Sequence, residues 1–158
     1  MSAEHGTRCH DCGAFAVHPV ARAGRTHKYR EFVTLPIPVD FAVPTCSRCG
    51  KTHFDAATMA VLLPLLESEY RRLLRRRIRQ LLERLNDHIS QRRLESLLGL
   101  SQGYLSRLRS GSGMPSTELV GHLALLANDP AGRLRELEQF WSQPPEKDER
   151  EDDVDPVR

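Results

Sequence analysis

The stretch ISQRRLESLLGLSQGYLSRLRSG, residues 89–111, contains the pair Ser-Gln at two places, eleven residues apart. Each serine precedes a run with leucine at helical spacing, where a serine hydroxyl accepts a hydrogen bond from the free N–H groups of a first turn. An apolar residue stands before each serine and a leucine follows four positions into each run, as in a hydrophobic staple. The pattern therefore predicts two short helices opened by Ser90 and Ser101, with a turn at Gly99-Leu100.

The length and spacing of these helices are those of a helix-turn-helix, whose second helix enters the major groove of DNA. Leu105 and Leu108 are expected to point inward, which leaves an outer face with Gln and Arg side chains able to pair with adenine and guanine. Gly103 on that face would let the backbone approach the DNA closely. The predicted DNA-binding residues are Ser90, Gln91, Arg92, Arg93, Ser101, Gln102, Gly103, Tyr104, Ser106, Arg107 and Arg109.

Within this set the expected roles differ. Gln102 and Arg107 would touch base edges, whereas Ser90, Arg92, Arg93 and Arg109 would hold phosphates, which fix register without reading sequence. Gln91 would either brace Gln102 or touch a phosphate. The alternative is a helical hairpin without a ligand.

Positive charge is concentrated around this stretch. The whole chain has a net charge of +2, but residues 146–158, EKDEREDDVDPVR, contribute −4, which leaves +6 on residues 1–145. Residues 71–109 hold eleven arginines against three acidic residues, a balance of +8. A polyanion is therefore an expected partner, although a solvated helix face would carry such charge too. The acidic tail is expected to be disordered.

The four cysteines form one five-residue motif used twice, Cys9-His-Asp-Cys12-Gly13 and Cys46-Ser-Arg-Cys49-Gly50. Two thiolates separated by two residues can bind one Zn²⁺ ion together. Two such Cys-x-x-Cys turns, called knuckles below, supply the four ligands of a tetrahedral site. We therefore predict one structural zinc ion held by Cys9, Cys12, Cys46 and Cys49. The competing hypotheses are disulfides, which a reducing cytosol disfavours, and substitution of a ligand by His5, His10 or His53.

Other patterns suggest the surrounding elements. IPVDFAV (37–43) alternates like a half-buried strand, and THKYREFV (26–33) is expected to form a weaker strand, joined to AFAVHPVAR (14–22) through a Gly24 turn. Helical spacing follows the N-cap candidate Asp55, with Pro64 expected to end, restart or kink the helix. Further helices are expected to begin near Thr117 and Ala131.

Residues 89–111 resemble the XRE, or lambda-repressor-like, helix-turn-helix family, whose five-helix domain would span about 71–141. The matching positions are Ser90-Gln91, Leu94, Leu98-Gly99, Ser101-Gln102, Leu105, Arg107, Gly111 and Pro115-Ser116. By this resemblance Gln91, Gln102, Gly103 and Arg107 fall where that family contacts operator DNA.

The whole chain is similar to the MqsA-type antitoxins, which join a CxxC…CxxC zinc domain to such a DNA-binding domain. The stretch CSRCGKTHFDAATMAVL (46–62) carries that similarity. The resemblance implies a zinc domain that docks a ribonuclease toxin, and a C-terminal domain that dimerises on a palindrome in its own promoter.

The expected fold class is therefore α+β, a small antiparallel-β zinc-binding domain followed by an all-α, five-helix, XRE-type domain. The expected boundaries are 1–63 for the zinc domain with its following helix, 64–145 for the DNA-binding domain and 146–158 for the tail. The expected function is that of a dimeric repressor of a palindromic operator on double-stranded DNA, the antitoxin of a type II pair with a ribonuclease toxin.

Two alternatives stay open, a regulator with a non-toxin protein partner and a zinc-ribbon RNA-binding factor. An enzyme is not expected, because no Cys-His or Ser-His pairing stands at motif spacing and the cysteines suit a metal. No apolar run of about eighteen residues and no signal-peptide pattern occurs, so we expect a cytoplasmic protein without membrane segments.

Overall fold

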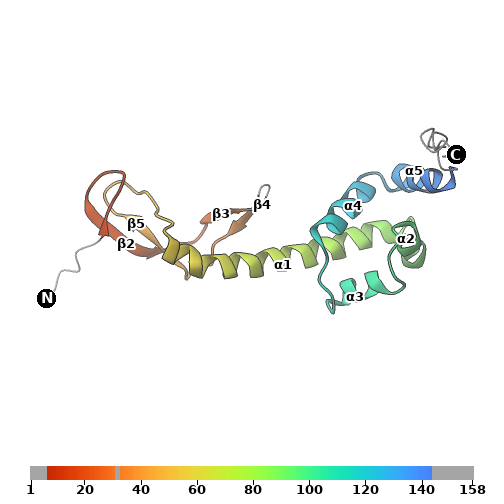
Figure 1. Cartoon of the computed structure of the whole chain (residues 1–158), viewed down its shortest axis with the longest axis horizontal. Helices are drawn as coiled ribbons and strands as arrows, with labels where there is room; N and C mark the ends of the chain where they lie inside the picture. Colours follow the sequence, from red (N-terminus) through yellow and green to blue (C-terminus); the bar gives the residue numbers. More distant parts are fainter. Residues whose placement is uncertain (1–6, 31–32, 144–158) are drawn as a thin grey trace, which may run out of the picture. The chain divides into compact units, whose positions relative to one another are not determined.

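A computed structural model describes residues 7–30 and 33–143 of the chain, as a small antiparallel β region followed by five helices (Figure 1). The α+β class expected from the sequence is confirmed. The chain divides into two compact units, Met1–Leu74 and Arg75–Arg158. The acidic tail, 146–158, lies outside the described residues.

Five strands form two antiparallel sheets in the first unit. They are β1 (Thr7–Arg8), β2 (Phe15–Ala21), β3 (Thr26–Tyr29), β4 (Val33–Pro36) and β5 (Ala42–Cys46). One sheet has the order β1-β2-β5 and the other pairs β3 with β4. Val17 on β2 faces Cys46 at the end of β5, so this pairing brings the second pair of cysteines back beside the first.

The strand expected over residues 37–43 is wrong, because the chain turns at Val39-Asp40 between β4 and β5. Pro36 and Pro38 have no N–H to donate to a sheet, and aspartate favours turns, so the alternating pattern is interrupted. Phe41 N–H closes the turn on Pro38 O at 3.0 Å. Val39 is consequently 62% exposed, whereas Val43 is fully buried in β5.

Gly24 does form the expected turn, with a φ of 77° that suits glycine. The two strands that this turn joins do not pair with each other, however. β2 pairs with β1 and β5, and β3 pairs with β4, so the turn joins strands of different sheets. Sequence alternation located β2 and the beginning of β3 but did not show which strands pair, because pairing depends on long-range contacts.

Helix α1 (Ala56–Asn86) begins after Asp55, whose Oδ1 accepts the Thr58 N–H at 2.7 Å, as expected of an N-cap. It runs on through Pro64, so the expected end or restart at this proline is wrong. A buried stripe continues on both sides of the proline, at Leu62, Leu66, Tyr70 and Leu74. We infer that burial of this stripe outweighs the one backbone hydrogen bond that proline removes.

The second unit contains the end of α1 and four shorter helices, α2 (Gln91–Leu97), α3 (Tyr104–Ser110), α4 (Thr117–Asn128) and α5 (Pro130–Ser142). The expected starts near Thr117 and Ala131 are confirmed to within one residue. Ser116 and Asp129 cap these two helices, accepting the N–H groups of Leu119 and Gly132.

One core of aliphatic side chains holds these helices together. Its buried members include Ile78 and Leu85 of α1, Leu94 of α2, Leu105 and Leu108 of α3, Leu123 of α4 and Leu134 of α5. Two long-range hydrogen bonds also join these helices. Arg84 donates to Ala127 O at 2.9 Å, and Trp141 Nε1 donates to Leu97 O at 3.1 Å. In the described part of the chain, no helix has the length and apolar content to cross a bilayer.

Candidate functional site

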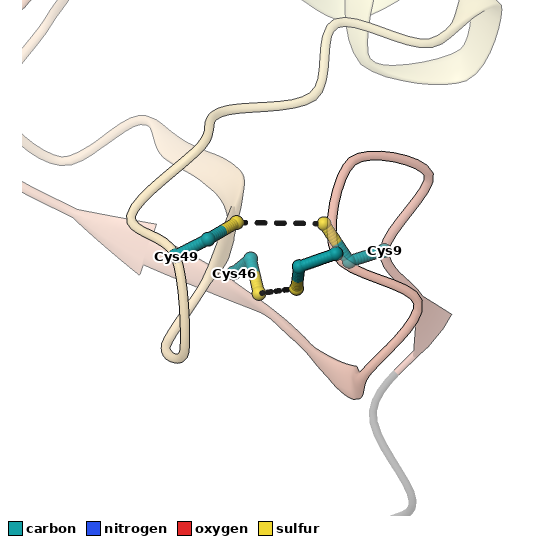
Figure 2. A group of neighbouring side chains, drawn as sticks. Cys9, Cys46 and Cys49 are labelled. Carbon is teal, nitrogen blue, oxygen red and sulfur yellow. Dashed lines mark hydrogen bonds between the residues drawn. The ribbon is translucent and has the colours of Figure 1, made fainter.

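The four cysteines come together as one cluster, with all four sulfurs within 4.8 Å of one another. Cys9 Sγ lies 3.6 Å from Cys49 Sγ, and Cys12 Sγ lies 3.7 Å from Cys46 Sγ (Figure 2). Sulfurs bound about 2.3 Å from a tetrahedral ion lie about 3.8 Å apart. A disulfide would bring them to about 2.0 Å, and all four thiols are free. The spacing is therefore that of four ligands of one metal ion.

The repeated motif produces the same backbone turn twice. Gly13 N–H donates to Cys9 O at 2.9 Å, and Gly50 N–H donates to Cys46 O at 2.8 Å. The φ angles of these glycines are 73° and 75°, in the left-handed region that residues with a Cβ rarely adopt. The glycine after each second cysteine is thus required by the turn.

Backbone N–H groups of this turn also favour a thiolate. The N–H of Cys49 donates to the Cys46 sulfur and, helped by that of Arg48, outweighs desolvation and lowers the pKa of Cys46 to about 7. The Lys51 N–H likewise favours the Cys49 thiolate, but desolvation and the neighbouring sulfurs act against it and raise the pKa of Cys49 to about 12. Four thiolates this close need a cation to be ionised together, so metal binding would release protons.

Burial of the cluster agrees with a structural role for the metal. Cys9 and Cys46 are buried together with Val17, whereas Cys12 is half-buried and Cys49 is exposed. Four thiolate ligands leave no coordination position for a substrate. Of the three histidines considered from the sequence, His53 approaches the cluster, with Nε2 at 3.4 Å from Cys9 Sγ. His5 lies outside the described residues.

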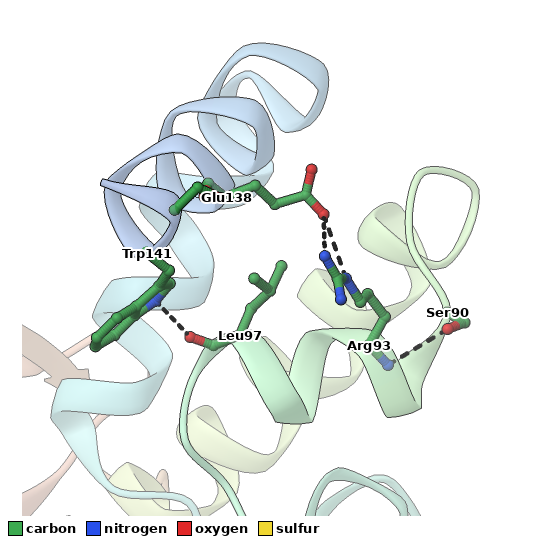
Figure 3. Close-up of polar contacts among 6 residues, drawn as sticks. Ser90, Arg93, Leu97, Glu138 and Trp141 are labelled. Atoms are coloured by element: carbon green, nitrogen blue, oxygen red, sulfur yellow. Dashed lines mark hydrogen bonds and ion pairs between the residues drawn. The ribbon is translucent and has the colours of Figure 1, made fainter. Parts of the chain in front are cut away.

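The second candidate site is the pair α2 and α3. Ser90 caps α2 as expected, since its Oγ accepts the Arg93 N–H at 3.4 Å (Figure 3). The cap expected from Ser101 is wrong. Helix α3 begins at Tyr104, and its N-cap is Gly103. Ser101 contributes only its backbone carbonyl, which accepts the Tyr104 N–H at 3.0 Å.

Gly103 therefore has a different role from the one expected. Its φ is 79°, so the residue ends the turn in a left-handed conformation rather than sitting inside the helix. A Cβ there would meet no backbone atom, and the nearest contact would be Arg107 Nη1 at 3.6 Å. Glycine is thus favoured by the backbone angle of the turn, not by crowding.

Glu95 of α2 supplies the cap that Gly103 lacks. Its Oε2 accepts the Gly103 N–H and its Oε1 accepts the Leu105 N–H, both at 2.9 Å. Glu95 is 3% exposed, the one charged side chain buried within residues 7–30 and 33–143. This role of Glu95 was not predicted from the sequence. The sequence did contain a signal for it. Glu95 stands between the inward leucines of α2, eight residues before Gly103, which has no side chain to cap α3.

Gln91 belongs to the same network. Its Nε2 donates to Glu95 Oε1 at 3.4 Å, so this side chain, expected to brace Gln102 or to touch a phosphate, contacts Glu95. The carboxylate therefore connects the start of α2 to the start of α3.

Of the side chains expected on the outer face of the second helix, Ser106 and Arg107 lie on α3 and are exposed, whereas Gln102 lies in the turn before it. Leu105 and Leu108 are buried, as predicted. Gly103 and Tyr104 are half-buried, and Arg107 Cζ lies 5.8 Å from the Tyr104 ring centre. In this part of the predicted set, Ser101 and Gln102 of the turn and Ser106, Arg107 and Arg109 of α3 are exposed.

Of the predicted phosphate contacts on α2, Ser90 and Arg92 are exposed. Arg93 instead has a partner within the chain, since its guanidinium lies 3.1 Å from Glu138 of α5 (Figure 3). Both side chains remain largely exposed, so the ion pair is weak. A phosphate contact by Arg93 would have to compete with Glu138.

Acidification is expected to destabilise the second unit through Glu95. Burial opposes its ionisation, but the Gly103 and Leu105 N–H groups outweigh burial and lower the pKa of Glu95. The unfolded chain, with a glutamate pKa of about 4.3, then binds more protons. The stabilisation is therefore complete above about pH 4.3 and lost as pH falls through the folded-state pKa. Urea unfolding at several pH values should show that the free energy of unfolding falls with pH. This dependence on pH should be weaker in Glu95→Gln, and an equal dependence in the two proteins would contradict the prediction.

No family model, curated protein or solved structure matches this chain.

Proposed function

We propose that the protein is a sequence-specific DNA-binding transcriptional repressor that acts as a homodimer on a palindromic operator. One observation carries this proposal. Helices α2 and α3 are joined by a short turn, the leucines of α3 are buried, and polar and cationic side chains are exposed at Gln102 in the turn and at Ser106 and Arg107 on α3. A second helix presenting such side chains is what a helix-turn-helix places in the major groove.

On this proposal the exposed side chains divide into two groups. Gln102 and Arg107 contact base edges, because their amide and guanidinium groups match adenine and guanine. Ser90, Arg92 and Arg109 contact phosphates and fix the register. The arginines of α1, which are exposed along residues 71–79, add a non-specific attraction for DNA.

A second copy of the chain would read the other half of a palindrome, about one helical turn away. An apolar pocket of about 580 Å³ lies between α2, α4 and α5, lined in part by Leu125 and Trp141. Three large apolar side chains of α4 and α5 are at least 64% exposed, namely Leu125, Phe140 and Trp141. Leu134, which is also on α5, is buried in the core and is not part of this surface. These exposed side chains, with Arg133 and Glu136 beside the pocket, support a self-complementary interface.

The metal of the four-cysteine cluster is Zn²⁺ in this proposal, with a structural role. The further role, antitoxin of a ribonuclease toxin that docks on the zinc unit, is supported by the resemblance to MqsA-type antitoxins. Co-purification of this chain with the product of the adjacent reading frame tests the role of antitoxin. If no such partner co-purifies, the antitoxin role is contradicted and the proposed DNA-binding function remains.

Arg107→Ala is expected to weaken operator binding by about 1–3 kcal/mol and to relax preference at one base position, because a guanidinium pairs bidentately with guanine. The measurement is a titration of a selected palindrome, with the base at each position varied. Arg135→Ala is the matched control, since it removes the same charge from an exposed position on α5.

Equal losses in the two variants would show that Arg107 acts only through charge. Footprinting separates the proposal from the RNA-binding alternative. Protection of one palindrome supports a repressor, whereas salt-sensitive binding to any nucleic acid without a footprint contradicts it.

A further inference from the structure

Three donor atoms of different kinds lie together beside the four-cysteine cluster. Cys9 Sγ, a carboxylate oxygen of Asp11 and a ring nitrogen of His53 are all within 4.8 Å of one another. His53 Nε2 is 3.4 Å from Cys9 Sγ. A thiolate and an imidazole bound to one tetrahedral Zn²⁺, at about 2.3 and 2.0–2.1 Å, lie about 3.5 Å apart. Cys9 and His53 are therefore spaced as two ligands of one ion.

The backbone of the two knuckles holds these donors in place. Asp11 lies in the tight turn that the Gly13 N–H closes on Cys9 O. His53 follows the second knuckle, where its N–H donates to Pro44 O at 2.8 Å and the preceding Thr52 bridges to Thr45. Cys9 is buried, His53 is half-buried and Asp11 is exposed. The group of three donors is therefore accessible to solvent on the side of Asp11.

One ion cannot use all the donors present. In the part of the chain that the structure describes, the donor atoms form two groups that share only Cys9. His53 is not grouped with Cys12, Cys46 or Cys49, so it does not replace one of them around the first ion. A thiolate sulfur keeps a lone pair after binding one cation. Four thiolates with one divalent ion also retain a charge of about −2, which favours a second cation.

We propose that Cys9, Asp11 and His53 form a second metal site, bridged to the first through the Cys9 sulfur, for a divalent transition metal such as Zn²⁺ or Co²⁺. Three protein ligands leave one position for water, as in sites that exchange ligands. The second ion is therefore held less tightly than the first and is removed first by a chelator. The proposal rests on the binding of one ion by the four cysteines.

The test is titration of the metal-free full chain with Co²⁺, whose thiolate and d–d absorption reports each ion as it binds. Wild type is expected to take up two equivalents, the second more weakly and with a separate spectrum. Asp11→Asn and His53→Gln should each lose the second equivalent and keep the first. His10→Gln is the matched control, because this histidine neighbours His53, with ring centres 6.1 Å apart, but belongs to neither donor group.

Each other outcome overturns the proposal in a distinguishable way. Saturation of wild type at one equivalent leaves the four-cysteine site intact and makes His53 a hydrogen-bond donor to the Cys9 thiolate. Two equivalents that persist in both variants place the second ion elsewhere. Failure to bind any equivalent refutes the first site as well.

Discussion

Removing the metal from the full chain is expected to unfold residues 7–55 and to leave the helices of the second unit folded. Metal binding to such a site contributes on the order of 10–16 kcal/mol, and that free energy is available only to the folded knuckles. Two of the three buried residues in the cluster core, Cys9 and Cys46, are themselves predicted ligands. Without a cation, little apolar packing remains around the four sulfurs to stabilise the folded state of this region.

Hydrogen exchange measured residue by residue, before and after chelation, checks this expectation. Amides of β2 and β5 should lose protection, whereas those of α2 to α5 should keep it, since Ile78, Leu94 and Leu123 form a separate core. Cys46→Ser is a second route to the same state and needs no chelator. Loss of protection throughout the second unit would show that its stability depends on the metal.

Glu95→Ala is expected to destabilise the second unit by about 1–3 kcal/mol, because it leaves the Gly103 and Leu105 N–H groups without their acceptor. The start of α3 should loosen, so operator affinity should fall although Glu95 itself is buried. Urea unfolding gives the stability, and DNA titration at a temperature where the variant is folded gives the affinity.

Glu138→Ala is the matched control. It also removes a carboxylate that pairs with a neighbouring element, but its side chain and that of Arg93 are 44% and 59% exposed. Its expected cost is about 0–1 kcal/mol. A loss for Glu95→Ala as small as this would contradict the capping role. Glu95→Gln, which keeps one acceptor oxygen, should fall between the two.

Features that depend on neighbours in the chain could be predicted from the sequence. The duplicated Cys-x-x-Cys-Gly motif identified the four cysteines that come together, because the turn around each pair is local. Helical spacing and capping residues identified most helix starts, including those after Asp55, Ser90 and Ser116. The inward leucines of α3 followed from the same periodicity.

Features that depend on distant partners were missed or wrong. The sequence did not show that β2 pairs with β5 and not with β3, the next strand along the chain. One local feature was also wrong, the strand over 37–43, because prolines and a turn residue within the segment interrupt the alternation. Pro64 does not end α1, since the buried stripe continues beyond it.

The sequence by itself determined which cysteines come together, which helices form and which face of α3 is apolar, because motif spacing and periodicity act over a few residues. Only the tertiary structure decided that Glu95 caps α3, that Arg93 pairs with Glu138 and that His53 lies against Cys9. Each of these contacts joins residues eight or more positions apart. Packing of whole elements, and not the local pattern, sets such distances.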